Sequence, residues 1–272
     1  MIKIYLAGAT GQLGEYLKFK IKKKKNYKLF DTKIDLSKKK SFLFLKKLNP
    51  DVIINCAGLS SVEDCELNYK KALRLNYSIP KNLNNFCIKE NKYLIHFSTD
   101  HLYDSFNNTE NDVKLLNNYA KSKFRGEKTV DISKFLVLRI NFFGHYKKKK
   151  GLLNWIYKSN KSKKIINLYN NIFFSPLYIK TVFEILLKII KLRKAGIYNF
   201  GSNNGISKSE FAKFVIKLKK FKINYKEVRY ENKKNLIKRP KNMIMNVKKF
   251  EKTFKLKLPN IKKEIYKINE KL

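Results

Sequence analysis

Short apolar runs alternate with segments of helical period along the first half of the chain. Such runs, bounded by Gly, Asn, Asp or Pro, are typical of strands that are buried on both faces. They occupy residues 3–8, 27–31, 51–58, 92–99 and 135–144. The segments between them have apolar residues three and four apart, which predicts helices at residues 12–23, 41–49, 61–74, 76–90 and 117–130. This alternation predicts βαβ units, and therefore an α/β fold with a doubly wound parallel sheet.

The pattern becomes less regular after Gly144. Two pairs with capping-box spacing predict helix starts, namely Ser60 with Glu63 and Ser207 with Glu210. Further apolar patterns predict two helices and a strand, at residues 151–160, 177–193 and 196–201.

No internal repeat and no long linker divides the chain, so we expect any second unit to be interwoven with the first. We predict a larger unit at residues 1–144, to which residues 165–200 return. A smaller lobe then comprises residues 145–164 and 201–272. The length of 272 residues and the hydrophobic fraction of 43% are sufficient for a sizeable core.

The net charge is +41, yet only six of the 62 basic residues are Arg. Arg is the residue that proteins prefer for bidentate contacts to phosphates and bases. The Lys excess is spread along the whole chain beside many Asn and Ile residues, as AT-rich codon usage would produce. We therefore predict that binding to specific nucleic acid is not the main function, since charge alone indicates non-specific association.

The cysteines and the most apolar helix both favour a cytoplasmic protein. Cys56, Cys65 and Cys87 lie inside apolar or helical patterns and form no CxxC pair, which predicts a reducing compartment and no metal site. The first apolar run is too short for a signal peptide. The segment 182–192 carries three charged residues, so we expect an amphipathic helix there and no membrane span.

A glycine-rich turn, GATGQLG, joins the first predicted strand to the first predicted helix. Gly8, Gly11 and Gly14 would let the backbone and the helix N-terminus approach a phosphate, with Gln12 and Leu13 in the same turn. Asp31 ends the second strand, where a carboxylate can accept hydrogen bonds from a ribose 2′-OH. The turn therefore predicts a dinucleotide cofactor. Asp31 favours NADH, but Lys33, two residues further on, could instead bind the 2′-phosphate of NADPH, so both cofactors stay open.

Tyr119 and Lys123 lie four residues apart in the helix predicted at 117–130, and therefore on one face of it. A nearby cation lowers the pKa of a phenol, which can then serve as an acid or base near neutrality. A solvated surface pair is the structural alternative. Thr99 lies at the carboxyl end of the fourth strand, where parallel sheets bind their ligands.

Five motifs in this order resemble an extended short-chain dehydrogenase/reductase: the glycine turn, NCAG, STD, YxxxK and FRGE. The stretches PDVIINCAGLSSVEDCE, STDHLYD, NNYAKSK and KRPKNMIMN are similar to the dTDP-4-dehydrorhamnose reductase family. The resemblance covers nearly the whole chain. It implies a Rossmann-type fold, NADPH or NADH as cofactor, and reduction of a keto-sugar nucleotide in the cytoplasm by a chain that can form a homodimer.

The resemblance also implies roles for individual residues. Tyr119 would donate a proton to the sugar keto oxygen, with Thr99 bonded to the same oxygen and Lys123 holding the cofactor ribose. Residues that would line the cofactor beyond the glycine turn are Asp31, Asp35, Leu36, Asn55, Ala57 and Gly58. Residues that would bind the sugar nucleotide are Ser60, Asp100, His101, Phe142 and Arg239.

Several alternatives stay open at the level of sequence. Asp35 could instead cap the following helix, Asn76 could cap a helix or support the site, and Arg239 could pair with Glu251 on the surface. His101 replaces an aromatic residue of the family and Phe142 replaces a Trp, so the identity of the sugar stays open. An epimerase or dehydratase is the alternative activity, although a dehydratase would carry Glu in place of His101. A catalytically silent regulatory subunit of the same fold is the third reading.

Overall fold

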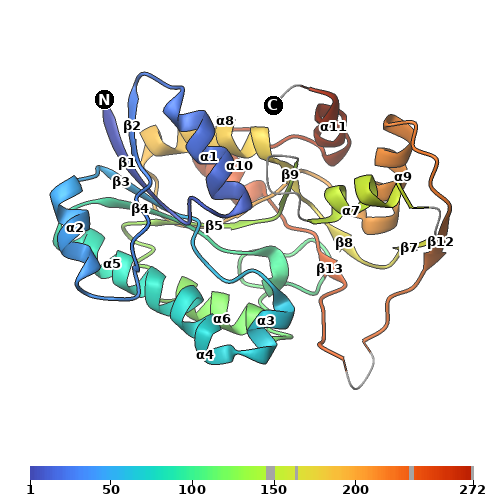
Figure 1. Ribbon diagram of the computed structural model, residues 1–272, viewed down its shortest axis with the longest axis horizontal. Coiled ribbons are helices and arrows are strands. Elements are labelled where there is room, and N and C mark those ends of the chain that lie inside the picture. The colour runs from blue at the N-terminus through green and yellow to red at the C-terminus, as the bar shows by residue number, and fades with distance from the viewer. Residues whose placement is uncertain (145–150, 163–164, 233–235, 271–272) are drawn as a thin grey trace. The chain divides into compact units, whose positions relative to one another are not determined.

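The computed structural model describes residues 1–144, 151–162, 165–232 and 236–270. The chain forms two compact units, whose elements are labelled in Figure 1. Unit 1 comprises Met1–Thr99, Leu115–Arg139 and Ile185–Tyr198. Unit 2 comprises Asp100–Lys114, Ile140–Glu184 and Asn199–Leu272.

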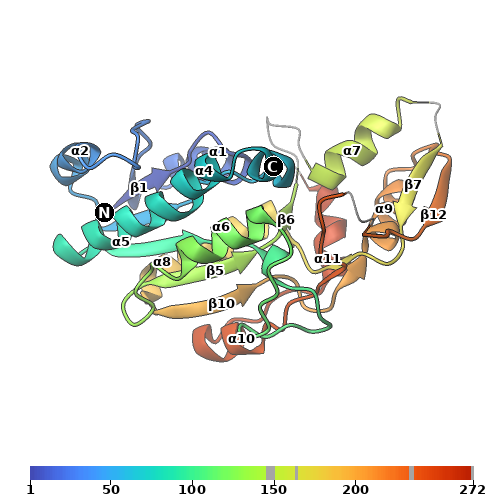
Figure 2. The same cartoon turned by 90° about the horizontal axis from the view of Figure 1, so that it is seen from below.

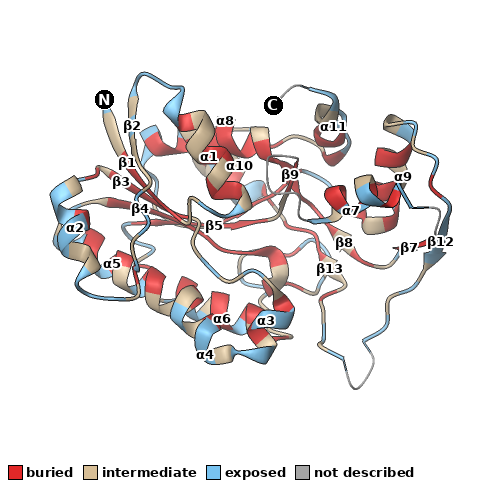
Figure 3. Cartoon of the chain, in the orientation of Figure 1, coloured by how far each residue is buried: buried red, intermediate tan, exposed pale blue. Residues whose placement is uncertain are grey.

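A six-stranded sheet lies at the centre of unit 1, in the order β10-β5-β4-β3-β1-β2. Its strands are β1 (Ile2–Ala7), β2 (Tyr27–Phe30), β3 (Val52–Asn55), β4 (Tyr93–Phe97), β5 (Leu136–Ile140) and β10 (Gly196–Phe200). Strands β1 to β5 pair in parallel, with Ile4 opposite Val52 and Asn55 opposite His96. The side chains of β3, β4 and β5 are buried on both faces, as Figure 3 shows for the middle of the sheet, whereas the edge strand β2 is partly exposed. The predicted α/β fold with a parallel sheet is confirmed.

Helices cover both faces of this sheet. In Figure 1, α1 lies on one side of the sheet, and α5 and α6 lie on the other. Figure 2 shows α5 and α6 running side by side. The helical segments of unit 1 are α1 (Gln12–Lys22), α2 (Ser41–Leu48), α3 (Val62–Leu67), α4 (Tyr69–Leu73), the π-helical turn η1 (Arg74–Ser78), α5 (Ile79–Lys89), α6 (Asn118–Glu127) and the second half of α8 (Ile179–Leu192).

The region predicted as two helices, 61–74 and 76–90, is a run of four short helical segments, α3 to α5 with η1 between them. The predicted capping pair of Ser60 and Glu63 is wrong. Ser61 caps α3 instead, and its Oγ accepts a hydrogen bond from the backbone N–H of Asp64 at 3.0 Å. Both serines stand three residues before an acidic residue, so the spacing alone could not distinguish them.

Unit 2 is built from short strands and helices around an apolar core. Its strands are β6 (Phe142–Phe143), β7 (Ile166–Tyr169), β8 (Phe173–Phe174), β9 (Leu177–Tyr178), β11 (Ile206–Ser207), β12 (Tyr225–Val228) and β13 (Asn242–Met243). Its helical segments are η2 (Asp100–Leu102), α7 (Gly151–Ser159), the start of α8, α9 (Lys208–Leu218), α10 (Lys248–Phe254), α11 (Ile261–Tyr266) and η3 (Lys267–Asn269). Phe211 of α9 is fully buried, and its ring packs 5.0 Å from Phe143 and 5.5 Å from Phe174 between ring centroids.

The capping box of Ser207 and Glu210 is confirmed at the start of α9, because the Ser207 hydroxyl accepts from the Glu210 N–H and the Glu210 carboxylate accepts from the Ser207 N–H. Within the described ranges, no helix has both the length and the apolar character that crossing a membrane requires.

Candidate active site

The glycine turn between β1 and α1 is closely packed on its inner side and open at Gly11. Gly8 has φ +78°, and a Cβ on it would lie 2.5 Å from the backbone nitrogen of Ala57. A Cβ on Gly14 would lie 2.2 Å from the carbonyl oxygen of Gly8. A Cβ on Gly11, in contrast, would meet only that same oxygen, at an ordinary 3.4 Å. Gly8 and Gly14 are therefore required by the packing of the turn itself, because neighbouring backbone atoms leave no space for a side chain there. Gly11 is not required by packing, and the absence of a side chain at this position leaves room for a ligand.

The first turn of α1 carries no side-chain cap, since its N-cap residue is Gly11. Its N–H groups can therefore bind the phosphates of a dinucleotide. The turn, with Gln12 and Leu13 opening the helix, fits the cofactor that the sequence predicts.

Asp31 follows β2 and is bound by two lysines of α1. Its carboxylate lies 2.5 Å from Lys18 Nζ and 3.3 Å from Lys22 Nζ. Burial opposes its ionisation, but the two lysines outweigh this effect, so the pKa of Asp31 is lowered. Asp31 is therefore an ionised acceptor beside the first helix.

Asp35 is not the cap of α2. Its Oδ1 accepts hydrogen bonds from the backbone N–H of Ser37 at 3.1 Å and from its hydroxyl at 2.6 Å, and both bonds lower the pKa of Asp35. The helix begins six residues later, at Ser41. Leu36, beside Asp35, is buried. The alternative reading of Asp35 as a helix cap is thus wrong.

Helix α6 presents Tyr119 and Lys123 to the interior of unit 1. Asn117 caps the helix by accepting a hydrogen bond from the Ala120 N–H at 2.9 Å. Tyr119 is 9% exposed and Lys123 is 6% exposed, so the pair is not a solvated surface contact. Lys123 Nζ donates to the carbonyl oxygen of Phe97, at the end of β4, over 2.8 Å.

Burial lowers the pKa of Lys123 to about 8, against the opposing charges of Glu127, Cys56 and Cys65. At neutral pH the ammonium is therefore protonated but easily deprotonated. Such a cation on the helix turn after Tyr119 is suited to favour the phenolate of that residue when a proton is transferred.

Asn76 connects the helix of Tyr119 to the segment after β3. It is fully buried in the π-helical turn η1, and its Nδ2 donates to Leu59 O at 3.0 Å and to Ser122 Oγ at 2.9 Å. Its Oδ1 accepts from the Leu59 N–H at 2.8 Å. Asn76 is therefore not a helix cap but a support of the site. A π-helical turn is often found where a function requires it, although the local sequence pattern predicted only a helix here.

Gly126, from the motif FRGE, makes this connection close. A Cβ on Gly126 would lie 1.8 Å from the carbonyl oxygen of Asn76, so α6 and η1 touch through their backbones. Gly58 is similarly confined, since its Cβ would lie 2.7 Å from Asn76 Oδ1 and 3.8 Å from Lys123 Nζ. The motifs NCAG, YxxxK and FRGE thus meet around one asparagine.

Thr99 is 4% exposed and lies two residues after Phe97, whose carbonyl oxygen binds Lys123. The strand end that carries Thr99 is therefore attached to the helix that carries Tyr119 and Lys123. Ser60, which the resemblance assigned to substrate, is exposed and precedes the cap of α3.

Most residues expected to bind the sugar nucleotide lie in unit 2. Asp100 is 1% exposed and accepts a hydrogen bond from Asn141 Nδ2 at 2.6 Å. Burial, followed by the charges of Lys208 and Arg239, lowers the pKa of His101 to about 3, so this imidazole is neutral. Burial also lowers the pKa of Lys208, against the charge of Asp100. Two cations and a carboxylate are therefore near His101.

Sequence reasoning did not single out Lys208. It stands first in the capped helix α9, but a lysine in so lysine-rich a chain carries no local signal. Asn232 holds the backbone of Arg239, accepting from its N–H at 2.9 Å and donating to its carbonyl at 3.1 Å. Phe142, in β6, pairs with Leu177 of β9 and is partly exposed.

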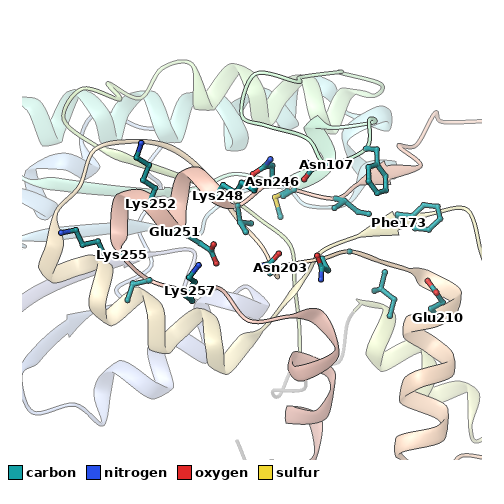
Figure 4. Close-up of a pocket in the computed structure, with 18 residues that line it drawn as sticks. Asn107, Phe173, Asn203, Glu210, Asn246, Lys248, Glu251, Lys252, Lys255 and Lys257 are labelled. Atoms are coloured by element: carbon teal, nitrogen blue, oxygen red, sulfur yellow. Dashed lines mark hydrogen bonds between the residues drawn. The ribbon is translucent and has the colours of Figure 1, made fainter.

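A separate recess of about 1070 Å³ in unit 2 contains none of the residues predicted to bind substrate. Figure 4 shows that Lys252 and Lys255, which line it, point away from Asn203, another of its lining residues. These lysines do not converge on one point, so we assign the recess no ligand. Among the described residues, no cluster of His, Cys, Asp or Glu has a composition suited to a metal ion.

Comparison with known proteins gives one family and a consistent fold. The model of the RmlD substrate binding domain family matches residues 2–272. A dTDP-4-dehydrorhamnose reductase of Aggregatibacter actinomycetemcomitans is 27% identical over 229 residues, which cover 78% of this chain and 77% of that protein.

Two crystal structures share the fold over 98% of this chain and 98% of their own. A dTDP-4-dehydrorhamnose reductase from Clostridium acetobutylicum has a TM-score of 0.90 at 23% identity. One from Bacillus anthracis, in complex with NADP, has a TM-score of 0.89 at 21% identity. At these identities the likeness establishes the fold, a sheet of the Rossmann type.

Proposed function

Because the chain belongs to the RmlD substrate binding domain family, we propose that it is an NAD(P)H-dependent reductase of a keto-sugar nucleotide, like the dTDP-4-dehydrorhamnose reductases that it resembles. The observation that carries this proposal is the buried pair of Tyr119 and Lys123, whose lysine is bound to the end of the strand that leads to Thr99. The open position at Gly11 supports a dinucleotide beside this pair, because backbone can approach a pyrophosphate only where no side chain intervenes.

The cofactor would be held by groups of unit 1. We propose that the glycine turn and the N-terminus of α1 hold the pyrophosphate, that Asp31 accepts from the adenosine ribose, and that Asp35 with Leu36 lies against the adenine. Asn55, Ala57 and Gly58 would line the other side. When bound, the reduced nicotinamide supplies the hydride that reaches the keto carbon.

The protein would supply the proton. Tyr119 donates its hydroxyl proton to the keto oxygen, which thereby becomes the alcohol, and Thr99 donates a second hydrogen bond to that oxygen. Tyr119 becomes a phenolate when it gives up its proton, and Lys123, which is protonated below about pH 8, stabilises this negative charge. A proton taken up from the solvent then restores the phenol, so that the reduction consumes one hydride and one proton in total.

Unit 2 would bind the sugar nucleotide. We propose that Arg239 makes a bidentate contact to the diphosphate and that Lys208 adds a second charge, since anionic oxygens are bound best by such donors. His101 and Phe142 would face the sugar, and the neutral imidazole can bond a hydroxyl group without a net charge. We further propose that the enzyme acts in the cytoplasm, with a homodimer as its expected assembly and no specific nucleic acid as partner.

The proposal is tested with the pure protein, NADPH or NADH, and a panel of keto-sugar nucleotides. We expect the reduced-nicotinamide absorbance to fall only when a keto-sugar nucleotide is present. Tyr119→Phe should lower turnover by ~10²–10⁴, the usual contribution of general acid–base catalysis, and leave the Kd for NADPH unchanged. Tyr225→Phe, at an exposed tyrosine of β12, is the matched control and should keep full turnover. Near-normal turnover by Tyr119→Phe would refute the assigned proton donor.

A further inference from the structure

His96 is a fully buried histidine with a specific hydrogen bond. It lies in β4 directly opposite Asn55 of β3, and its Nδ1 is 3.0 Å from Asn55 Nδ2. Asn55 Oδ1 accepts from the backbone N–H of Ala57 at 3.0 Å, which identifies the other end of this amide as the nitrogen. The amide nitrogen can only donate, so His96 Nδ1 must be the acceptor and the imidazole proton lies on Nε2.

Packing alone does not explain a histidine at this position. Burial, with the charge of Lys123, keeps the pKa of His96 well below its ordinary value, so the ring is neutral. Within the described residues, its Nε2 is buried and meets no hydrogen-bond acceptor. A buried N–H without an acceptor costs stability, and a leucine of similar size would avoid that cost. The histidine is explained better by the hydrogen bond that its Nδ1 accepts.

That hydrogen bond acts on the turn that faces Gly8. The Asn55 amide has two ends, and the bond from its nitrogen to His96 directs its oxygen to the Ala57 N–H. Ala57 N and the carbonyl carbon of Cys56 would lie only 2.5 Å and 2.6 Å from a Cβ on Gly8. A rotated amide would leave the Ala57 N–H without this partner, at a point where the backbone has no spare room.

We infer that His96 is a positioning residue for the cofactor: through the Asn55 amide it holds the turn Asn55–Gly58 in the form that binds a nicotinamide dinucleotide. This inference rests on the proposed function. His96 does not touch the reacting atoms and transfers no proton. Its contribution is one hydrogen-bond acceptor, Nδ1, which β4 places opposite Asn55 at the end of β3.

Two substitutions separate this role from simple packing. His96→Leu keeps an apolar volume and removes the acceptor. His96→Asn places an amide oxygen near the position of Nδ1, so it can accept from Asn55, but it leaves a small cavity. We expect His96→Leu to keep a thermal stability close to that of the wild type, because it removes the unpartnered Nε2–H but leaves an Asn55 N–H without its acceptor, and to bind NADPH about 10-fold more weakly. We expect His96→Asn to be less stable and to bind NADPH within about 2-fold of the wild type, since a matching acceptor is retained.

The measurements are the Kd for NADPH by titration calorimetry and the melting temperature of each protein without ligand. A purely structural role predicts the opposite order, in which the cavity variant His96→Asn binds worse than His96→Leu, and that order would overturn the inference. Ile95→Val, at the neighbouring core position of the same strand, is the control and should lower stability without changing the Kd. If the wild type itself binds no NADPH, the proposed function fails. If the wild type binds and His96→Leu binds equally well, only the role of His96 fails.

Discussion

Gly126→Ala places a methyl group where two backbones already touch. The added Cβ would lie 1.8 Å from the carbonyl oxygen of Asn76, whereas an ordinary contact begins at 3.4 Å, so the two segments must separate by about 1.6 Å. Neither side can yield through a flexible side chain, because the clash is between the backbone of α6 and that of η1. The same asparagine binds Leu59 and Ser122, so a shift of η1 also reaches the segment after β3.

The expected cost to stability is that of overpacking, about 1–3 kcal/mol. The better helix propensity of Ala offsets up to about 1 kcal/mol of it. The expected cost to catalysis is larger, because α6 carries Tyr119 and Lys123. A misplacement of about 1 Å can lower turnover by about 10²-fold, and the contact must open by more than that.

Urea unfolding followed by circular dichroism measures the first effect, and steady-state turnover with NADPH and a keto-sugar nucleotide measures the second. Lys121→Ala, on the exposed face of the same helix, is the matched control and should change neither by much. A Gly126→Ala protein with wild-type stability and turnover would refute the close backbone contact between α6 and η1, and with it the account of how Tyr119 is positioned.

Four other predictions follow from single features. Gly11→Val should fold normally yet lose NADPH affinity in a calorimetric titration, since a Cβ there meets no close protein atom; unchanged affinity would make the glycine turn purely structural. Arg139 and Glu127 form a buried ion pair, so Arg139→Met should lower the free energy of unfolding by about 3–5 kcal/mol because it leaves the Glu127 carboxylate unpaired. Adding Glu127→Leu should recover much of this loss. A small effect of Arg139→Met alone would contradict the pairing. The pH profile of kcat/KM should decline above about pH 8 as Lys123 loses its proton; a rate constant that stays flat to pH 10 would exclude a role for that charge. Arg239→Ala should raise KM for the sugar nucleotide several-fold at unchanged NADPH affinity, and Arg239→Lys should recover part of the loss. An unaltered KM would show that Arg239 does not bind the sugar nucleotide.

The sheet could be predicted from the sequence because buried parallel strands are short, continuous apolar runs. Ile53 and Ile95 are buried because both faces of the sheet are covered by helices, and the helical segments between the runs supply that cover. The capped start of α9 could be predicted for a different reason. A capping box is a local device in which Ser207 and Glu210 satisfy each other's backbone groups, so no distant residue decides it.

The supports of the site could not be predicted in the same way. Asn76 acts through Leu59 and Ser122, which are distant from it in the sequence, and its π-helical turn follows the same apolar pattern as an ordinary helix. Lys208 becomes a candidate ligand for the substrate only because the fold brings it near His101 and Arg239. The sequence could not distinguish it from the many other lysines of the chain. The roles of the residues expected to face the substrate stay predictions, because they were assigned from the family resemblance alone. At one of these positions, His101, the chain lacks the aromatic residue that the family carries.

Transfer of deuterium from reduced cofactor tests the central claim most directly. The protein is incubated with a keto-sugar nucleotide and NADPH that carries deuterium at the transferable position, and the sugar product is analysed by mass spectrometry. A reductase consumes one NADPH for each product molecule and leaves one deuterium on the carbon that bore the keto group. We predict this result for the wild type and its loss in Tyr119→Phe. A changed sugar without deuterium and without consumption of NADPH would indicate an epimerase and contradict the account.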